Sequence, residues 1–189
     1  ADFWKKARNL FEGAQLFAKH ELTHRDIKPA NILLNPKSNR IIYIDFGLSR
    51  NVKELTNDIL DGTKKTAFHW SYPFEYGLVS QAKKIIKMND VEADAFYKKT
   101  LKHVVSDISS DAHKNVKMML MLLDDRMFLM NDARIESMIY DAIDSMRHFK
   151  SPEECVATMS KTIDMFSLGL TMNMVLNAFY DAGKVTAAF

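Results

Sequence analysis

The segment from His24 to Asn31 places a carboxylate, an ammonium group and an amide close together on one polar stretch. Transfer of a γ-phosphoryl group needs a carboxylate that orients the attacking hydroxyl and accepts its proton. It also needs a cation for the developing phosphate charge and oxygen ligands for Mg²⁺. Asp26 offers the carboxylate, Lys28 the cation, and Asn31 an amide oxygen that can coordinate a hard cation. This spacing indicates phosphoryl-transfer chemistry on a loop.

A second segment, Asp45-Phe46-Gly47, could supply a further Mg²⁺ ligand. It follows the apolar run from Ile41 to Ile44, which reads as a buried strand. A carboxylate at the end of such a strand, followed by a flexible glycine, can reach a cation that bridges two phosphates. The tripeptide is weak evidence alone, but its position behind the first segment makes Asp45 a strong candidate.

The surrounding elements are expected to position these two segments. Residues 2–20 carry apolar side chains at helical spacing, which predicts an amphipathic helix before the first loop. Residues 32–34 and 41–44 are short β-prone runs, and the turn-forming residues 35–39 between them predict a β-hairpin. No regular period persists over residues 45–75, so we expect a long functional loop there.

Helices are expected through the second half of the chain. Within residues 78–150, an apolar stripe from Ile135 to Met146 repeats at helical spacing. Ser151 can cap a further helix, because a proline follows it and Glu154 completes a capping box. Residues 163–179 are apolar on nearly every face, which predicts a helix buried in the middle of a lobe.

The composition is that of an ordinary globular protein, with 47% hydrophobic and 26% charged residues. A net charge of +2 implies no bulk attraction to nucleic acid or to an anionic membrane. The longest apolar run, Met118 to Leu123, is far too short to span a bilayer, and no signal-peptide pattern opens the chain. The single cysteine, Cys155, fits a reducing compartment. These features favour a cytoplasmic location, with no nucleic-acid or membrane partner.

Taken together, the two segments resemble the C-terminal lobe of the eukaryotic protein kinase family. The resemblance implies that Asp26 is the catalytic base and that Lys28 contacts the phosphate of ATP. It implies that Asn31 and Asp45 bind Mg²⁺. His24 and Phe46 would be packing residues that hold the two loops together.

Two further segments extend the resemblance. Pro73-Phe74-Glu75 resembles the end of the family's activation segment. The stretch from Asp164 to Gly169 resembles the start of the central helix, whose aspartate braces the backbone of the catalytic loop. Lys28, two places after Asp26, resembles the serine/threonine kinases. The predicted function is therefore ATP-dependent phosphorylation of serine or threonine in a protein substrate, with ATP and Mg²⁺ as cofactors.

The sequence also departs from the family. It contains no glycine-rich phosphate loop and no strand lysine, so we expect residues 1–189 to be a partial catalytic domain without the small N-terminal lobe. The long connection from Glu75 to Asp164 predicts a helical insert at about 78–158. The predicted fold class is mainly α with a small β-hairpin (α+β). Alone, the chain is expected to be inactive, and its hairpin and Phe46 are expected to expose apolar surface.

Other interpretations remain open at this point. The chain could be a pseudokinase, a binding module in which the helical insert acts. It could also be a small-molecule kinase of the aminoglycoside or choline type, although Lys28 disfavours that class. Arg25 is either a surface arginine or the contact for a phosphorylated activation loop. The oligomeric state stays undetermined.

Overall fold

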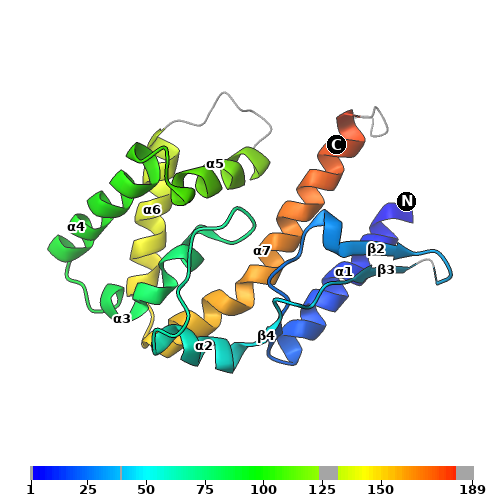
Figure 1. Ribbon diagram of the computed structural model, residues 1–189, viewed down its shortest axis with the longest axis horizontal. Helices are drawn as coiled ribbons and strands as arrows, with labels where there is room; N and C mark the ends of the chain where they lie inside the picture. Colours follow the sequence, from blue (N-terminus) through cyan, green and yellow to red (C-terminus); the bar gives the residue numbers. More distant parts are fainter. Residues whose placement is uncertain (1, 39, 124–131, 182–189) are drawn as a thin grey trace.

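The computed structural model describes residues 2–38, 40–123 and 132–181, which are mainly helical and include two small antiparallel sheets (Figure 1). The elements in chain order are α1 (Asp2–Lys19), β1 (Leu22–Thr23), the 3-10 helix η1 (Pro29–Asn31), β2 (Ile32–Asn35), β3 (Arg40–Tyr43), β4 (Arg50–Asn51), α2 (Val52–Leu60), the 3-10 helix η2 (Phe74–Gln81), α3 (Ala82–Ile85), α4 (Asp90–Leu101), the π-helix η3 (Lys102–Ser106), α5 (Asp111–Leu123), α6 (Asp132–Arg147) and α7 (Pro152–Asp181). The predicted mainly helical fold class is confirmed at this level.

The predicted N-terminal helix and hairpin are confirmed. Helix α1 packs against β3, and its residues Ala7, Leu10 and Ala14 are buried. Gly13 lies where the ring of Tyr43 approaches the helix, because an added Cβ there would lie 2.8 Å from that ring. The Tyr43 hydroxyl donates a hydrogen bond of 2.6 Å to the carbonyl of Leu10. The missing side chain at Gly13 therefore lets the hairpin dock onto α1.

The hairpin is antiparallel, with Ile32 opposite Tyr43 and Asn35 opposite Arg40. The Asn35 side chain accepts hydrogen bonds from the backbone N–H groups of Lys37 and Ser38, which is the turn chemistry that the sequence predicted. The last turn residue, Asn39, lies outside the described residues. A second, two-residue pairing joins β1, which directly precedes His24, to β4.

The expectation of an irregular loop over residues 45–75 is wrong in part, because helix α2 lies within it. The Asn51 side chain caps α2 by accepting hydrogen bonds from the N–H groups of Lys53 and Glu54. Val52, Leu55 and Ile59 bury one face of this short helix. Their helical spacing was present in the sequence, but it is short and follows a turn-rich stretch that hides it.

Helix α7 combines two elements that the sequence treated as separate. It runs unbroken from Pro152 to Asp181, so the predicted helix start and the predicted buried helix belong to one element (Figure 1). Ser151 caps it as predicted, because its hydroxyl accepts a hydrogen bond from the N–H of Glu154. The Glu154 carboxylate accepts from the N–H of Lys150, one residue earlier than a standard capping box would place it.

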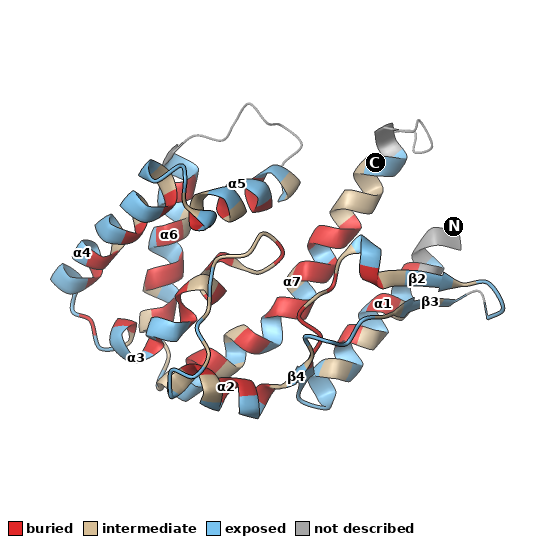
Figure 2. Cartoon of the chain, viewed as in Figure 1, coloured by how far each residue is buried: buried red, intermediate tan, exposed pale blue. Residues whose placement is uncertain are grey.

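Two buried clusters form the core, and α7 contributes to both (Figure 2). The larger cluster is formed by all the elements from α2 through α6 and by the first part of α7, including Cys155, Val156 and Ile163. The smaller one packs α1 and Ile27 against Leu168 and Met172. In the described part of the chain, no helix has the length and apolar character needed to cross a membrane.

Candidate active site

Asp164 of α7 fixes the backbone of the predicted catalytic segment, His24 to Asn31. Its carboxylate accepts hydrogen bonds from the backbone N–H groups of His24 (2.6 Å) and Arg25 (2.8 Å). Burial raises the pKa of Asp164, while these two hydrogen bonds act in the opposite direction. Arg25 holds a left-handed backbone conformation with φ of 67°. The predicted bracing role of Asp164 is thereby confirmed, and the loop is tied to the central helix at a strained position.

Asp26, Lys28 and Asn31 converge at the start of the hairpin. Lys28 Nζ lies 2.9 Å from Asp26 Oδ2. The Asn31 amide nitrogen donates to the same oxygen at 2.7 Å and to the backbone carbonyl of Asp26 at 2.9 Å. Asn31 is buried, whereas Asp26 is partly open to solvent. Two donors thus fix the orientation of one accessible carboxylate, and the Asn31 amide oxygen is the atom left for another ligand.

Asp45 follows the hairpin directly and is connected to the catalytic segment through its neighbour. The N–H of Ile44 donates to the carbonyl of Asn31 at 3.0 Å, and His24 Nε2 donates to the carbonyl of Ile44 at 3.1 Å. Asp45 itself is exposed, with φ of 61°, and its carboxylate accepts a hydrogen bond from the N–H of Gly47. The Asp45 carboxylate therefore lies in solvent. Asp45 directly follows Ile44, whose backbone forms hydrogen bonds with both His24 and Asn31.

The rings of His24 and Phe46 pack together and so connect the His24–Asn31 segment to the Asp45-Phe46-Gly47 segment, as predicted. Their centroids are 4.7 Å apart, and Phe17 of α1 packs against both rings. His24 Nδ1 also accepts a hydrogen bond from the N–H of Asp26 at 3.3 Å, which fixes the ring orientation. Because both ring nitrogens of His24 contact backbone groups, this buried histidine acts in packing and positioning.

Tyr72 contacts the catalytic segment in a way that the sequence did not indicate. Its hydroxyl donates a hydrogen bond of 2.7 Å to the carbonyl of Arg25, and burial raises its pKa to about 12. Ser167 of α7 binds the adjacent residue, donating to the carbonyl of Ser71 at 2.6 Å. The only signal in the sequence was position, because Tyr72 directly precedes the Pro73-Phe74-Glu75 segment.

The interpretation of Arg25 as a surface arginine is wrong. Its side chain is buried, with 8% of the residue exposed, and Nη1 donates to the carbonyl of Leu48 at 3.4 Å. Arg25 also lies close enough to Lys64 for its charge to lower the pKa of that amine, although burial of Lys64 is the larger cause. The Arg25 guanidinium is therefore buried against the backbone that directly follows Asp45-Phe46-Gly47.

Exposed apolar side chains occur on the hairpin and at Phe46, as expected. Phe46 is 52% exposed, and Leu33, Leu34, Ile42 and Leu48 are exposed as well. Leu33 lies opposite Ile42 in the hairpin, whereas Leu34 points to the other face because neighbouring strand residues alternate.

The predicted Mg²⁺ ligands Asn31 and Asp45 lie on two separate segments, one in η1 and one after β3. Among the described residues, no cluster of three or more His, Cys, Asp or Glu side chains could hold a metal ion. Mg²⁺ usually binds one or two carboxylates together with substrate phosphates and water. The Asp45 carboxylate and the Asn31 amide oxygen are ligands of this type.

The first part of the chain is similar to known protein kinases. Residues 3–72 match the family described as protein kinase domain. Over 46 residues the chain is 52% identical to MST7, a mitogen-activated protein kinase kinase of Pyricularia oryzae; this covers 24% of the chain and 10% of that protein. Over 54 residues it is 43% identical to serine/threonine-protein kinase 17A of Oryctolagus cuniculus, covering 28% and 14% respectively.

No solved structure matches the chain. The matched segments span only about a tenth to a seventh of these two relatives. All of the catalytic-loop residues, from His24 to Asn31, and the Asp45-Phe46-Gly47 segment lie inside the matched range. Residues 3–72 are therefore similar to the protein kinase domain, and both relatives are named as kinases.

Proposed function

We propose that this chain is the catalytic lobe of an ATP-dependent serine/threonine protein kinase. The observation that supports the proposal most directly is the double contact on one carboxylate: Lys28 and Asn31 both bind Asp26 Oδ2. A carboxylate held in a fixed orientation yet open to solvent can accept a proton from an incoming hydroxyl. The similarity to serine/threonine-protein kinase 17A favours this substrate class, as does the identity of Lys28.

In this proposal Asp26 orients the substrate hydroxyl and takes its proton as the oxygen attacks phosphorus. Lys28 keeps a positive charge within 2.9 Å of that carboxylate, where negative charge develops on the transferred phosphoryl group. Asn31 and Asp45 are the proposed Mg²⁺ ligands, and ATP with Mg²⁺ would supply the phosphoryl group. Asp164 and Tyr72 act as positioning residues, since both hold the backbone beside Asp26 rather than the reacting atoms.

The proposed domain organisation places a helical insert, at about 78–158, between the activation segment and the central helix. Helix α7 crosses position 158 without a break, so the insert would end inside a continuous helix. The sequence holds no glycine-rich loop and no strand lysine to bind the α- and β-phosphates. These 189 residues alone are therefore expected to transfer phosphate very slowly, because catalysis of this kind depends on positioning.

The test uses a fusion in which a protein kinase small lobe, with its glycine-rich loop and strand lysine, precedes these residues. Transfer from radiolabelled ATP to a serine-containing protein is measured for the fusion and for Asp26→Asn. We expect Asp26→Asn to lower the rate by at least about 100-fold while nucleotide binding stays nearly unchanged.

Asp141→Asn is the matched control, because this exposed aspartate lies on α6, outside the site. Turnover in the Asp26→Asn fusion close to that of the control would exclude Asp26 as the base. Binding of ATP without turnover in the unmodified fusion would favour a binding module instead.

A further inference from the structure

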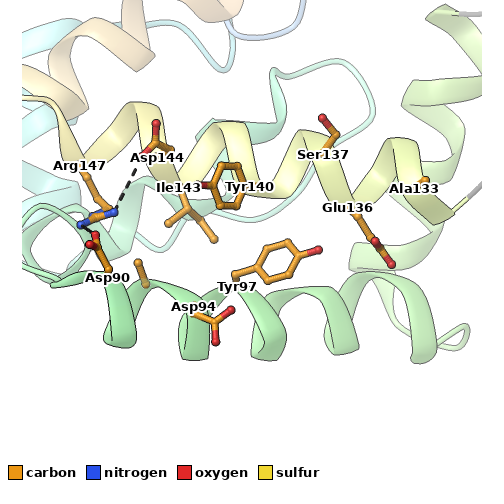
Figure 3. A pocket seen from close by; sticks show the side chains of 11 residues that line it. Asp90, Asp94, Tyr97, Ala133, Glu136, Ser137, Tyr140, Ile143, Asp144 and Arg147 are labelled. Carbon is orange, nitrogen blue, oxygen red and sulfur yellow. Dashed lines mark hydrogen bonds and ion pairs between the residues drawn. The ribbon is translucent and has the colours of Figure 1, made fainter.

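A groove runs between α4 and α6, in the part of the chain that the kinase family match does not cover (Figure 3). Its volume is about 510 Å³, and its walls are one face of each helix. The catalytic segment packs instead against α1, the hairpin and α7, so the groove belongs to a different surface (Figure 1). None of its lining residues takes part in the proposed phosphoryl transfer.

The groove is acidic in a chain whose net charge is +2. Its lining includes four carboxylates and one guanidinium. The guanidinium of Arg147 lies at one end, 2.6 Å from Asp90 and 3.9 Å from Asp144, so it offsets part of the negative charge there (Figure 3). Of the other two carboxylates, Asp94 pairs with the exposed Lys98, and Glu136 adds further negative charge.

Two tyrosines occupy the middle of the groove. The rings of Tyr97 and Tyr140 meet edge to face, with their centroids 6.2 Å apart, and Tyr140 is 61% exposed. Burial raises the pKa of the Tyr97 hydroxyl, and the charges of Glu136 and Asp94 raise it further, so both carboxylates lie near this ring. An exposed aromatic ring beside carboxylates is a typical site for an alkylammonium or guanidinium group.

We propose that the α4–α6 groove binds a basic segment of a partner protein. A lysine or arginine of that segment lies over the Tyr97 and Tyr140 rings, with its charge between Asp94 and Glu136. Its aliphatic stem then covers the apolar floor formed by Ala93 and Ile143. Anionic partners such as nucleic acid or an acidic membrane surface are repelled by the same carboxylates.

Within the chain, one lysine already pairs with a carboxylate of the groove. Lys98 Nζ lies 2.7 Å from Asp94 Oδ2, and both side chains are largely exposed. An exposed ion pair within one helix contributes little free energy, so an incoming cation can replace Lys98 at small cost. The ring pair adds an attraction that Lys98 does not use, which favours the partner segment over the internal lysine.

The experiment measures fluorescence anisotropy of the full chain with a labelled nine-residue peptide of alternating lysine and leucine. The comparison peptide carries acetyl-lysine at each lysine, which removes the charge and keeps the stem. We expect saturable binding of the first peptide only. Affinity should fall as salt is raised from about 50 to about 300 mM, because the contact is partly electrostatic.

Variants of the groove separate this site from general charge attraction. Tyr140→Ala and Glu136→Gln should each weaken binding by about fivefold or more, whereas Tyr140→Phe should bind like the parent because the ring is retained. Glu54→Gln removes an exposed carboxylate from α2, outside the groove, and should leave binding unchanged. Circular dichroism and thermal unfolding verify that each variant remains folded.

Several outcomes would overturn the proposal. Equal binding of the acetylated peptide would remove the cation as the recognised group. Equal weakening by Glu54→Gln and Glu136→Gln would show a general charge effect rather than a site. Absence of peptide binding, combined with self-association of the chain that Tyr140→Ala abolishes in sedimentation, would identify a second copy of the chain as the occupant.

Discussion

Asp164 accepts a hydrogen bond of 2.6 Å from the backbone N–H of His24, although the two residues are 140 positions apart. Its other carboxylate oxygen accepts from the N–H of Arg25 at 2.8 Å. Both oxygens of one buried side chain are therefore used to hold the backbone just before Asp26. This arrangement makes the position of Asp26, the proposed catalytic base, depend on helix α7.

Replacing Asp164 by asparagine should destabilise the fold. An asparagine offers one acceptor oxygen, so its amide nitrogen would face one of the two N–H groups and leave it without a partner. An unpaired buried donor costs roughly 1–3 kcal/mol of unfolding free energy. Urea denaturation of Asp164→Asn, with Asp141→Asn as the exposed control, measures the difference. Identical midpoints for the two variants would mean that the brace contributes nothing to stability.

The two glycines Gly13 and Gly169 allow a matched test of packing against helix propensity. Both lie in helices, so alanine should stabilise each by about 0.5–1 kcal/mol on propensity alone. At Gly13 the added Cβ would lie 2.8 Å from the Tyr43 ring, which the hydrogen bond to Leu10 holds in place. At Gly169 the added Cβ would meet no atom within 4 Å beyond its own helix turn.

We therefore expect opposite signs in thermal denaturation. Gly169→Ala should raise the unfolding free energy by the propensity gain, whereas Gly13→Ala should lower it by about 1–3 kcal/mol through overpacking. If both substitutions stabilised the chain equally, the contact between α1 and the hairpin would be looser than the structure indicates.

The sequence predicted features that depend on residues close together in the chain, and it missed contacts between residues far apart. Helix α1 and the hairpin were predictable because their signals, apolar periodicity and turn residues, are local. That Asp26, Lys28 and Asn31 lie together was predictable because they share one short segment. The contact between Tyr72 and the carbonyl of Arg25 joins residues 47 positions apart, and no local pattern encodes it. Only tertiary packing brings such partners together.

Helix α2 was missed for a different reason. Its apolar face has only a few members, and a nine-residue helix is too short for a periodic signal to stand out from its turn-rich surroundings. The merging of two predicted elements into α7 has the converse cause. Ser151 gave a clear start, but nothing between Glu154 and Ile163 marked an end, and the structure has none there.

His69 should make the fold sensitive to acid. Burial lowers its pKa, with a smaller opposing effect from the nearby charge of Asp26. Because the unfolded chain then binds a proton more readily than the folded one, stability is lost as the pH falls through the unfolded value of about 6.5.

The unfolding midpoint should therefore fall less steeply between about pH 7.5 and 5.5 in His69→Gln than in the parent chain. The exposed histidine His148 provides the control, through His148→Gln. Parallel curves for the parent and His69→Gln would show that this imidazole does not titrate differently in the two states.

Asp45 should contribute to nucleotide binding only in the presence of metal. Its carboxylate is exposed and makes one weak contact, with the N–H of Gly47, so its loss should leave the fold intact. In the small-lobe fusion, Asp45→Ala should weaken Mg²⁺-dependent ATP binding by at least about tenfold, with little change when EDTA is present. Titration calorimetry in both buffers distinguishes these cases. An equal loss in both would assign Asp45 a structural role.

Because α7 is continuous, it fixes how the two buried clusters are rotated relative to each other about the helix axis. Its 30 residues form a rod about 45 Å long, with Cys155 and Ile163 in the larger core, Leu168 in the smaller one, and Asp164 between them. Inserting one residue between Ile163 and Leu168 would rotate the two cores by about 100° relative to each other. The number of residues in this part of α7 therefore fixes the relative orientation of the two cores. Insertions or deletions there can be tolerated only when they add or remove close to a whole helical turn.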